Sequence, residues 1–139
     1  MSAHILATLD KGGITVDVLQ DEHLIHVTLK GMPAPDAIVE MLEKLNALIE
    51  MDASLRVLID ENDLHPSVVG PGDIGRFVHA WRHGKALRGA RLAVFVANIA
   101  MYGLNRMFQG VADAEGNVRV FHDRAQAVAW LDGRVTENN

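Results

Sequence analysis

The sequence predicts an α/β fold, in which a single-layer mixed, mostly parallel β-sheet carries four helices in the order β-β-α-β-α-β-α-β-α. Two observations lead to this prediction. Near the start of the chain, two neighbouring stretches alternate apolar and polar residues, which is typical of a hairpin of half-buried strands. Further on, short apolar stretches take turns with stretches of helical periodicity, and this alternation favours right-handed crossovers onto a parallel sheet.

Period-two patterning predicts the opening hairpin. Apolar side chains alternate with polar ones over residues 14–18 and again over 25–29, and a polar turn at 20–22 separates the two runs. Gly31 ends the second run. We therefore expect two antiparallel strands in this part of the chain.

Apolar spacing and capping residues predict the helices. The first begins at Pro35 and Asp36, because proline suits the first turn and a carboxylate favours the positive end of the helix dipole. From Ile38 to Ile49 its apolar residues recur at helical spacing. After this helix we expect a strand at 55–59, a loop at 61–72 and a helix that is capped by Asp73 and ends near Gly84. A buried strand at 92–97, a helix capped by Asn98, a strand at 118–121 and a helix capped by Asp123 are expected to follow.

The length of 139 residues indicates a single domain spanning 1–139. Residues 14–132 form its expected core, and 1–11 and 133–139 are expected to be flexible ends. A chain of this length buries roughly two-thirds of its surface on folding, which is enough for a core without disulfides or metals.

The composition excludes several classes of protein. There are no cysteines, so disulfides, thiol nucleophiles and cysteine metal sites are excluded. The chain begins without a positively charged segment ahead of an apolar run, and no apolar run approaches the ~20 residues that span a bilayer. The net charge of −5 argues against general nucleic-acid binding. We expect a cytoplasmic protein that neither spans a membrane nor binds nucleic acid.

The charges are unevenly distributed along the chain. Residues 1–73 have a net charge of −9, whereas residues 74–112 have +6 and contain no acid. Such a basic stretch favours an anionic partner: an acidic protein helix, a phospholipid headgroup, or the acidic half of a second copy in a homodimer. A solvated face balanced by the acidic first helix is the alternative. The candidate binding residues are Arg76, Arg82, Lys85 and Arg88, together with Asp73 and Asp60.

Two histidines have the spacing of metal ligands but are not expected to bind one. His79 and His83 lie one helical turn apart, so both rings could reach a single ion. The segment between them lacks the glutamate of the zinc-binding motif, and Arg82 disfavours a cation. A solvated helix face is the simpler interpretation.

Acidic residues follow the strand at 55–59. Asp60, Glu61 and Asp63 are of the type that holds hydrated magnesium at the carboxyl end of a strand, but acids are also common turn formers. No nucleophile elbow, phosphate-binding glycine loop or dinucleotide fingerprint occurs. The sequence therefore predicts no enzymatic activity, no cofactor and no metal.

Several stretches of the chain resemble one family. They are Gly31 ahead of a long helix, Leu55–Asp60, Arg91–Ala97, and Val118–Asp123 with Ala127–Leu131. Together with the element order, they are similar to the SpoIIAA-like, or STAS-like, domains in their small bacterial STAS/SEC14-type branch. The resemblance covers roughly residues 14–132, and it implies a regulatory domain of the anti-sigma-factor-antagonist type.

The resemblance also implies where a phosphoserine switch would lie. In the antagonists, a kinase phosphorylates a serine at the start of the helix that follows the strand matched here by 55–59. In this chain the turn is Val69–Gly75, which contains no hydroxyl, and the nearest one is on Ser67. Asp73 supplies a permanent negative charge there. We therefore expect no phosphoserine switch.

Three hypotheses about function remain open. The first is a non-catalytic regulatory domain that binds a protein partner or a second copy of itself. The second, implied by lipid-binding relatives within the resemblance, is a carrier of a small amphipathic or lipid-like ligand, with Phe77, Trp81, Met101 and Met107 as pocket candidates. The third is an enzyme whose site carries no known motif.

Overall fold

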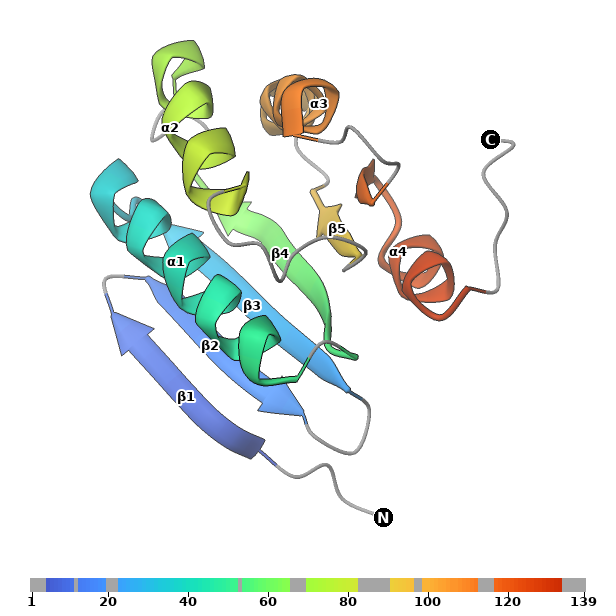
Figure 1. Ribbon diagram of the computed structural model, residues 1–139. Helices are drawn as coiled ribbons and strands as arrows, with labels where there is room; N and C mark the ends of the chain where they lie inside the picture. The colour runs from blue at the N-terminus through green and yellow to red at the C-terminus, as the bar shows by residue number, and fades with distance from the viewer. Residues whose placement is uncertain are drawn as a thin grey trace.

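A six-stranded β-sheet forms the centre of the computed structural model, and helices lie on both of its faces (Figure 1). The structure describes residues 5–11, 13–19, 23–52, 54–65, 70–82, 91–96, 99–112 and 117–133. The strands are β1 (Ile5–Lys11), β2 (Ile14–Leu19), β3 (Leu24–Gly31), β4 (Arg56–Leu64), β5 (Leu92–Phe95) and β6 (Val118–Phe121). The helices are α1 (Pro35–Met51), α2 (Pro71–Arg82), α3 (Ile99–Ala112) and α4 (Arg124–Leu131).

The strands lie in the sheet in the same order as in the sequence, from β1 to β6. β2 is antiparallel to both of its neighbours, β1 and β3, whereas β3, β4, β5 and β6 are parallel. The sheet is therefore mixed and mostly parallel, as the sequence predicts, and the predicted hairpin and helices are confirmed. Two helix starts agree as well, since α1 begins at Pro35 and Asp123 caps α4 by accepting the Ala125 amide at 2.8 Å. α2 begins at Pro71, two residues ahead of its expected cap Asp73, because the turn before it already has helical geometry. The expected cap Asn98 and the expected end near Gly84 lie outside the described residues.

The sequence analysis missed one strand. Residues 1–11, expected to be a flexible end, include β1, which pairs with the outer edge of β2. The connection turns at Gly13, whose φ of +90° lies in the region that favours glycine. A Cβ on Gly13 would lie 2.3 Å from the carbonyl oxygen of Lys30. Pairing with β1 satisfies backbone groups that β2 would otherwise expose at an edge, a requirement that side-chain patterning does not reveal.

The winding of the chain places three helices on one face of the sheet. Right-handed crossovers through α1, α2 and α3 each advance to the next strand in the same direction, so these helices cover a common face. α4 follows β6 and packs on the opposite face against β4, β5 and β6. Because the winding never reverses, the sheet has no topological switch point, the place where open α/β sheets usually bind ligands.

Alternate strand residues separate two hydrophobic cores. The larger core lies between the sheet and α1–α3 and includes Val27, Leu45, Val57, Trp81 and Val94. The smaller core lies beneath α4 and consists of Leu58, Ala93, Ala127, Trp130 and Leu131. Neighbouring residues of β4 therefore contribute to different cores, as expected for a strand buried on both faces.

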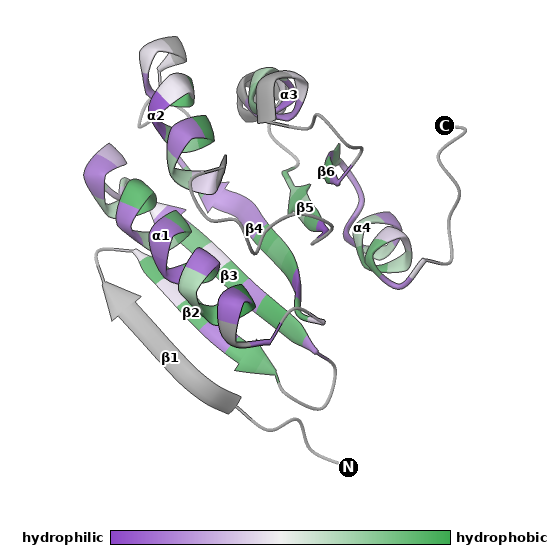
Figure 2. Cartoon of the chain, in the orientation of Figure 1, coloured by the Kyte–Doolittle hydropathy of each residue, from purple (hydrophilic) through white to green (hydrophobic). Residues whose placement is uncertain are grey.

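β4 is longer than the sequence predicts. The expected strand ends at residue 59 and a loop was expected over 61–72, whereas β4 continues to Leu64 beside β3. Figure 2 shows β4 changing from hydrophobic at its start to hydrophilic toward its end. Backbone pairing with β3 maintains the strand through this polar stretch, which the side-chain pattern alone suggests is a turn.

Candidate functional site

A β-bulge near the end of β4 determines which acidic side chains face the helices. The register passes from Thr28↔Asp60 to Lys30↔Asp63, so β4 has one residue more than β3 over this interval. Within the bulge, Asp60 Oδ1 accepts the Asn62 amide at 2.9 Å. Bulges of this kind redirect side chains and occur often beside functional sites.

Glu61 lies on the inner side of the bulge. It continues the alternation of Val57 and Ile59, whose side chains belong to the larger core, and only 7% of its surface is exposed. Asn62 and Asp63 are exposed, and Leu64 returns to the core because the extra residue shifts the alternation. The result is a carboxyl group among the apolar residues beneath the helices.

Asn105 of α3 is the hydrogen-bond partner of Glu61. Its Nδ2 donates to Glu61 Oε1 at 2.7 Å, and Asn105 itself is 9% exposed. The two side chains line a cavity of about 40 Å³ between α2 and the strands beneath it. The other lining residues are apolar: Leu29, Ile38, Met41, Leu42, Ile59, Leu64, Ile74, Phe77, Val94 and Phe108.

The environment of Glu61 favours its neutral form. Burial raises the pKa of its carboxyl to about 7, the charge of Asp60 acts in the same direction, and the hydrogen bond from Asn105 opposes both. A pKa near 7 means that this side chain gains or loses a proton near neutral pH, in a region lined mostly by apolar side chains. Perturbed acids of this kind are frequent at functional sites.

A second polar cluster joins the starts of α1 and α2. Asp73, the third residue of α2, accepts the Gly70 amide at 3.1 Å, so it caps the helix from inside its first turn. Arg76 bonds to Asp36 at the start of α1 and lies 3.8 Å from Asp73. These contacts raise the pKa of Arg76, chiefly through its hydrogen bond to Asp36.

This cluster changes the interpretation of the predicted cationic face. Arg76 is exposed, as the sequence analysis requires, but two carboxylates accompany its charge. The side chain of Arg82 and the whole of Lys85 and Arg88 lie outside the described residues. The cationic surface therefore remains a prediction that depends on those three residues.

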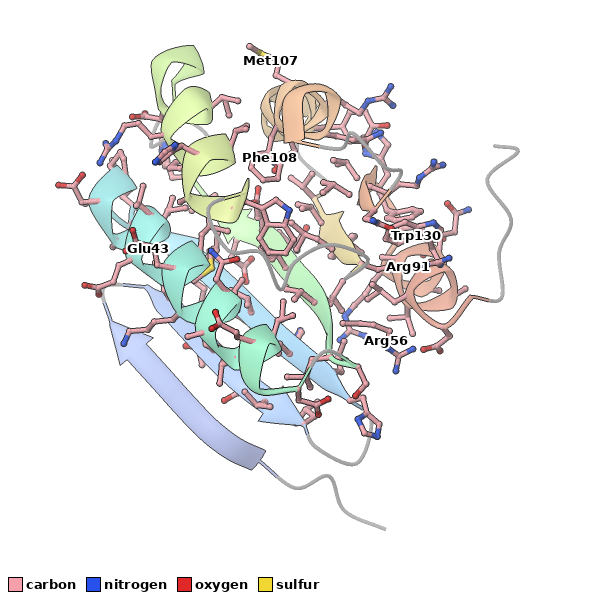
Figure 3. The ribbon with its side chains drawn as sticks, viewed as in Figure 1. Glu43, Arg56, Arg91, Met107, Phe108 and Trp130 are labelled. Carbon is pink, nitrogen blue, oxygen red and sulfur yellow. The ribbon has the colours of Figure 1, made fainter. Side chains whose placement is uncertain are left out.

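Two other members of the basic stretch have structural contacts. Arg91 lies with its guanidinium 5.0 Å from the ring centroid of Trp130 and donates to the carbonyl of the same residue (Figure 3). Arg106 donates to the hydroxyl of Tyr102 at 3.2 Å. Arg91 thus fixes α4 on the sheet, and it is half-buried rather than part of an exposed face.

The four pocket candidates do not converge on one pocket. Phe77 lines the cavity beside Glu61, while Trp81 is buried in the larger core without lining that cavity. Met107 is 47% exposed and lies on the outer side of α3, away from its inward neighbour Phe108 (Figure 3). The side chain of Met101 lies outside the described residues.

The predicted metal candidates are also separated. Glu61 faces the helices, whereas Asp63 is exposed and Asp60 is engaged in the bulge. His79 is exposed on α2, and His83 lies outside the described residues. Among the side chains that the structure describes, no three acidic or histidine residues come together as a metal site would require.

Sequence reasoning placed Glu61 in a loop and did not select it for the binding set. Continuing the alternation of Val57 and Ile59 by one step would have placed it on the buried face. The contribution of Asn105 could not be found in this way, because it comes from a helix 44 residues further along the chain.

These features describe an α/β domain with a buried acid–amide pair beneath its helices and no assembled catalytic constellation among the described residues. The family model of SpoIIAA-like proteins matches residues 24–132, and the chain belongs to this family. Domains of this family are typically regulatory, commonly bind proteins and are generally not enzymes. No curated protein matches the chain significantly.

Among the described residues, no helix is both long enough and apolar enough to cross a membrane.

Proposed function

We propose that this chain is a non-catalytic regulatory domain that binds a protein partner and works without a phosphoserine switch. The observation that carries the proposal is the start of α2. A fixed carboxylate, Asp73, caps the helix there and lies beside Arg76, at the place where the resemblance to the antagonists implies a phosphorylated serine. A permanent negative charge at a helix N-terminus is favourable and needs no kinase.

Intact-mass and phosphopeptide analysis of the protein isolated from its own cells tests the absence of a switch. We expect unmodified protein. A stoichiometric phosphate on Ser67, the nearest hydroxyl in the preceding loop, would contradict the proposal. Asp73→Asn provides a second measurement: it removes the fixed charge and should weaken partner binding if that charge takes part in recognition.

We further propose that the partner is anionic and binds the surface carrying Arg82, Lys85 and Arg88. The support is the charge of +6 over residues 74–112. Asp36 and Asp73 accompany Arg76 and offset its charge. Most of the attraction for an anionic partner must therefore come from Arg82, Lys85 and Arg88. Clustered charge speeds encounter with a partner of opposite sign, and salt screens it over a Debye length of about 8 Å at physiological strength.

Charge reversal tests this surface. Arg82→Glu with Arg88→Glu should weaken association and reduce its salt dependence, whether the partner is a protein or a second copy. The matched control is Lys44→Glu with Arg124→Glu, which changes the net charge equally at exposed positions on α1 and α4. Equal weakening by both pairs would show that only net charge matters and would refute a defined surface.

The carrier hypothesis finds little support in the cavity beneath α2. Sites for small ligands usually measure about 300–1,000 Å³. The cavity has about 40 Å³, so in this conformation it is too small for an amphipathic ligand.

A further inference from the structure

Among the residues that the structure describes, Glu61 is the only titratable side chain that lines the cavity. The groups facing it from the surrounding elements are Leu29 on β3, Val94 on β5, Ile38, Met41 and Leu42 on α1, Ile74 and Phe77 on α2, and Asn105 and Phe108 on α3. None of these carries a charge. Asp60, its neighbour in β4, is the one charged group that acts on the carboxyl.

The lining of the cavity disfavours the ionised form of Glu61. A carboxylate offers about four acceptor sites, and Asn105 donates a single hydrogen bond to Oε1. Ten of the twelve lining residues are apolar. An ionised Glu61 must therefore attract water, and the cavity of about 40 Å³ has room for a few molecules, since each needs roughly 10–15 Å³.

The strand and the helices around the cavity differ in the contacts that attach them to the sheet. β4 is paired with β3 as far as Leu64 and with β5 over Val57–Asp60. α1 packs directly on β2, and α3 packs on β6, where Gln109 Oε1 accepts the Val120 amide at 3.0 Å. α2 instead packs between α1 and α3 (Figure 1), where Asn46 of α1 donates a buried hydrogen bond to the Ala80 carbonyl at 2.7 Å. Nearer its start, α2 presents Ile74 and Phe77 to the cavity. Water drawn toward Glu61 therefore acts most easily against α2.

We propose that Glu61 is a proton-binding site that sets how firmly α2 lies over the cavity. With Glu61 neutral, the cavity stays nearly dry and α2 is closely packed. With Glu61 ionised, water enters the cavity and α2 loosens from the sheet. α3 stays attached, because the hydrogen bond from Asn105 to Glu61 becomes charge-assisted and therefore stronger. The proton thus acts on the helix that Arg76 joins to α1.

Two measurements on the whole protein test the site. The ¹³C chemical shift of the Glu61 carboxyl, followed from pH 4 to pH 9, should titrate with a midpoint near 7. Amide hydrogen exchange at pH 6 and pH 8.5, corrected for the intrinsic pH dependence, should show roughly tenfold lower protection in α2 at the higher pH. The reason is that about one pH unit separates pH 6 from the midpoint near 7, and each unit corresponds to a factor of ten. α4, on the opposite face, is the internal control: those of its amides that exchange by local opening, rather than by global unfolding, should not change.

Variants separate the proposal from a general loss of stability. In Glu61→Gln, protection in α2 should become independent of pH. Asp60→Asn keeps the native Glu61 and removes the neighbouring charge, so the midpoint should move to lower pH. Asp63→Asn, at an exposed position of the same bulge, should leave it unchanged.

Three results would overturn the proposal. One is a Glu61 midpoint between 4 and 5, the ordinary range of the side chain. Another is a pH-dependent loss of protection in α2 that persists in Glu61→Gln. The third is an equal loss of protection in the locally opening amides of α4, which would show that the proton does not act on α2 in particular.

Discussion

Glu61→Gln should make the protein's stability less dependent on pH. Glutamine keeps the size of the side chain and an oxygen that can accept the Asn105 hydrogen bond, but it cannot ionise. In the folded protein, burial raises the pKa of Glu61 from 4.5 to about 7. The folded state therefore binds a proton more tightly than the unfolded state does, so Glu61 makes the folded protein progressively less stable as the pH rises from about 4.5 through 7.

The size of the effect follows from the shift in pKa. Each unit corresponds to about 1.4 kcal/mol, so the wild type should lose up to about 3 kcal/mol relative to Glu61→Gln between pH 4.5 and pH 8.5. Loosening of α2 relieves part of this cost, which makes the value an upper limit. In thermal unfolding, it corresponds to a relative shift in melting temperature of roughly 10 °C.

Urea denaturation of both proteins at half-unit steps of pH measures the difference directly. The glutamine amide adds a constant offset, because it places a donor in an apolar cavity, but that offset does not change with pH. The quantity to examine is therefore the slope of the difference. Parallel curves for the two proteins would refute the argument, since they would mean that Glu61 has the same pKa in the folded and unfolded states.

Three further predictions concern single substitutions. Asn105→Leu removes the hydrogen bond that lowers the pKa of Glu61, so the carboxyl midpoint in an NMR titration should rise above 7; a fall would contradict the assigned role of the amide. Gly13→Ala places a Cβ 2.3 Å from the Lys30 oxygen and should destabilise the hairpin by about 1–3 kcal/mol in urea denaturation, and no change would show that the turn relaxes easily. Asp123→Ala removes the side-chain cap of α4 and should cost about 1 kcal/mol, whereas Asp123→Asn, a comparably good cap, should cost much less.

Patterns with a strong local cause were predictable from the sequence. The apolar spacing of α1 and the alternation of β2 and β3 depend on burial of one face, and burial leaves a period in the sequence. The caps at Pro35 and Asp123 depend on orphan backbone groups at helix ends, which are local as well. For these elements, sequence and structure agree closely.

Elements that depend on a distant partner were not predictable in the same way. β1 exists as a strand because β2 offers it an edge, and β4 continues through Asp60–Asp63 because β3 pairs with its backbone. Neither pairing leaves a side-chain period. The candidate site was missed for a related reason, since the polarity of Glu61 suggested a turn, and only the fold brings Asn105 to it.

The order of the strands also bears on how the chain acquires its structure. Every pair of hydrogen-bonded strands is consecutive in the sequence, so no strand must wait for a later segment to supply its partner. The antiparallel hairpin closes a short loop, whereas each parallel pairing must close a longer crossover, so we expect the hairpin to form faster than the parallel part of the sheet. During synthesis, the N-terminal hairpin can form first, and each following strand and helix can add to an edge already in place.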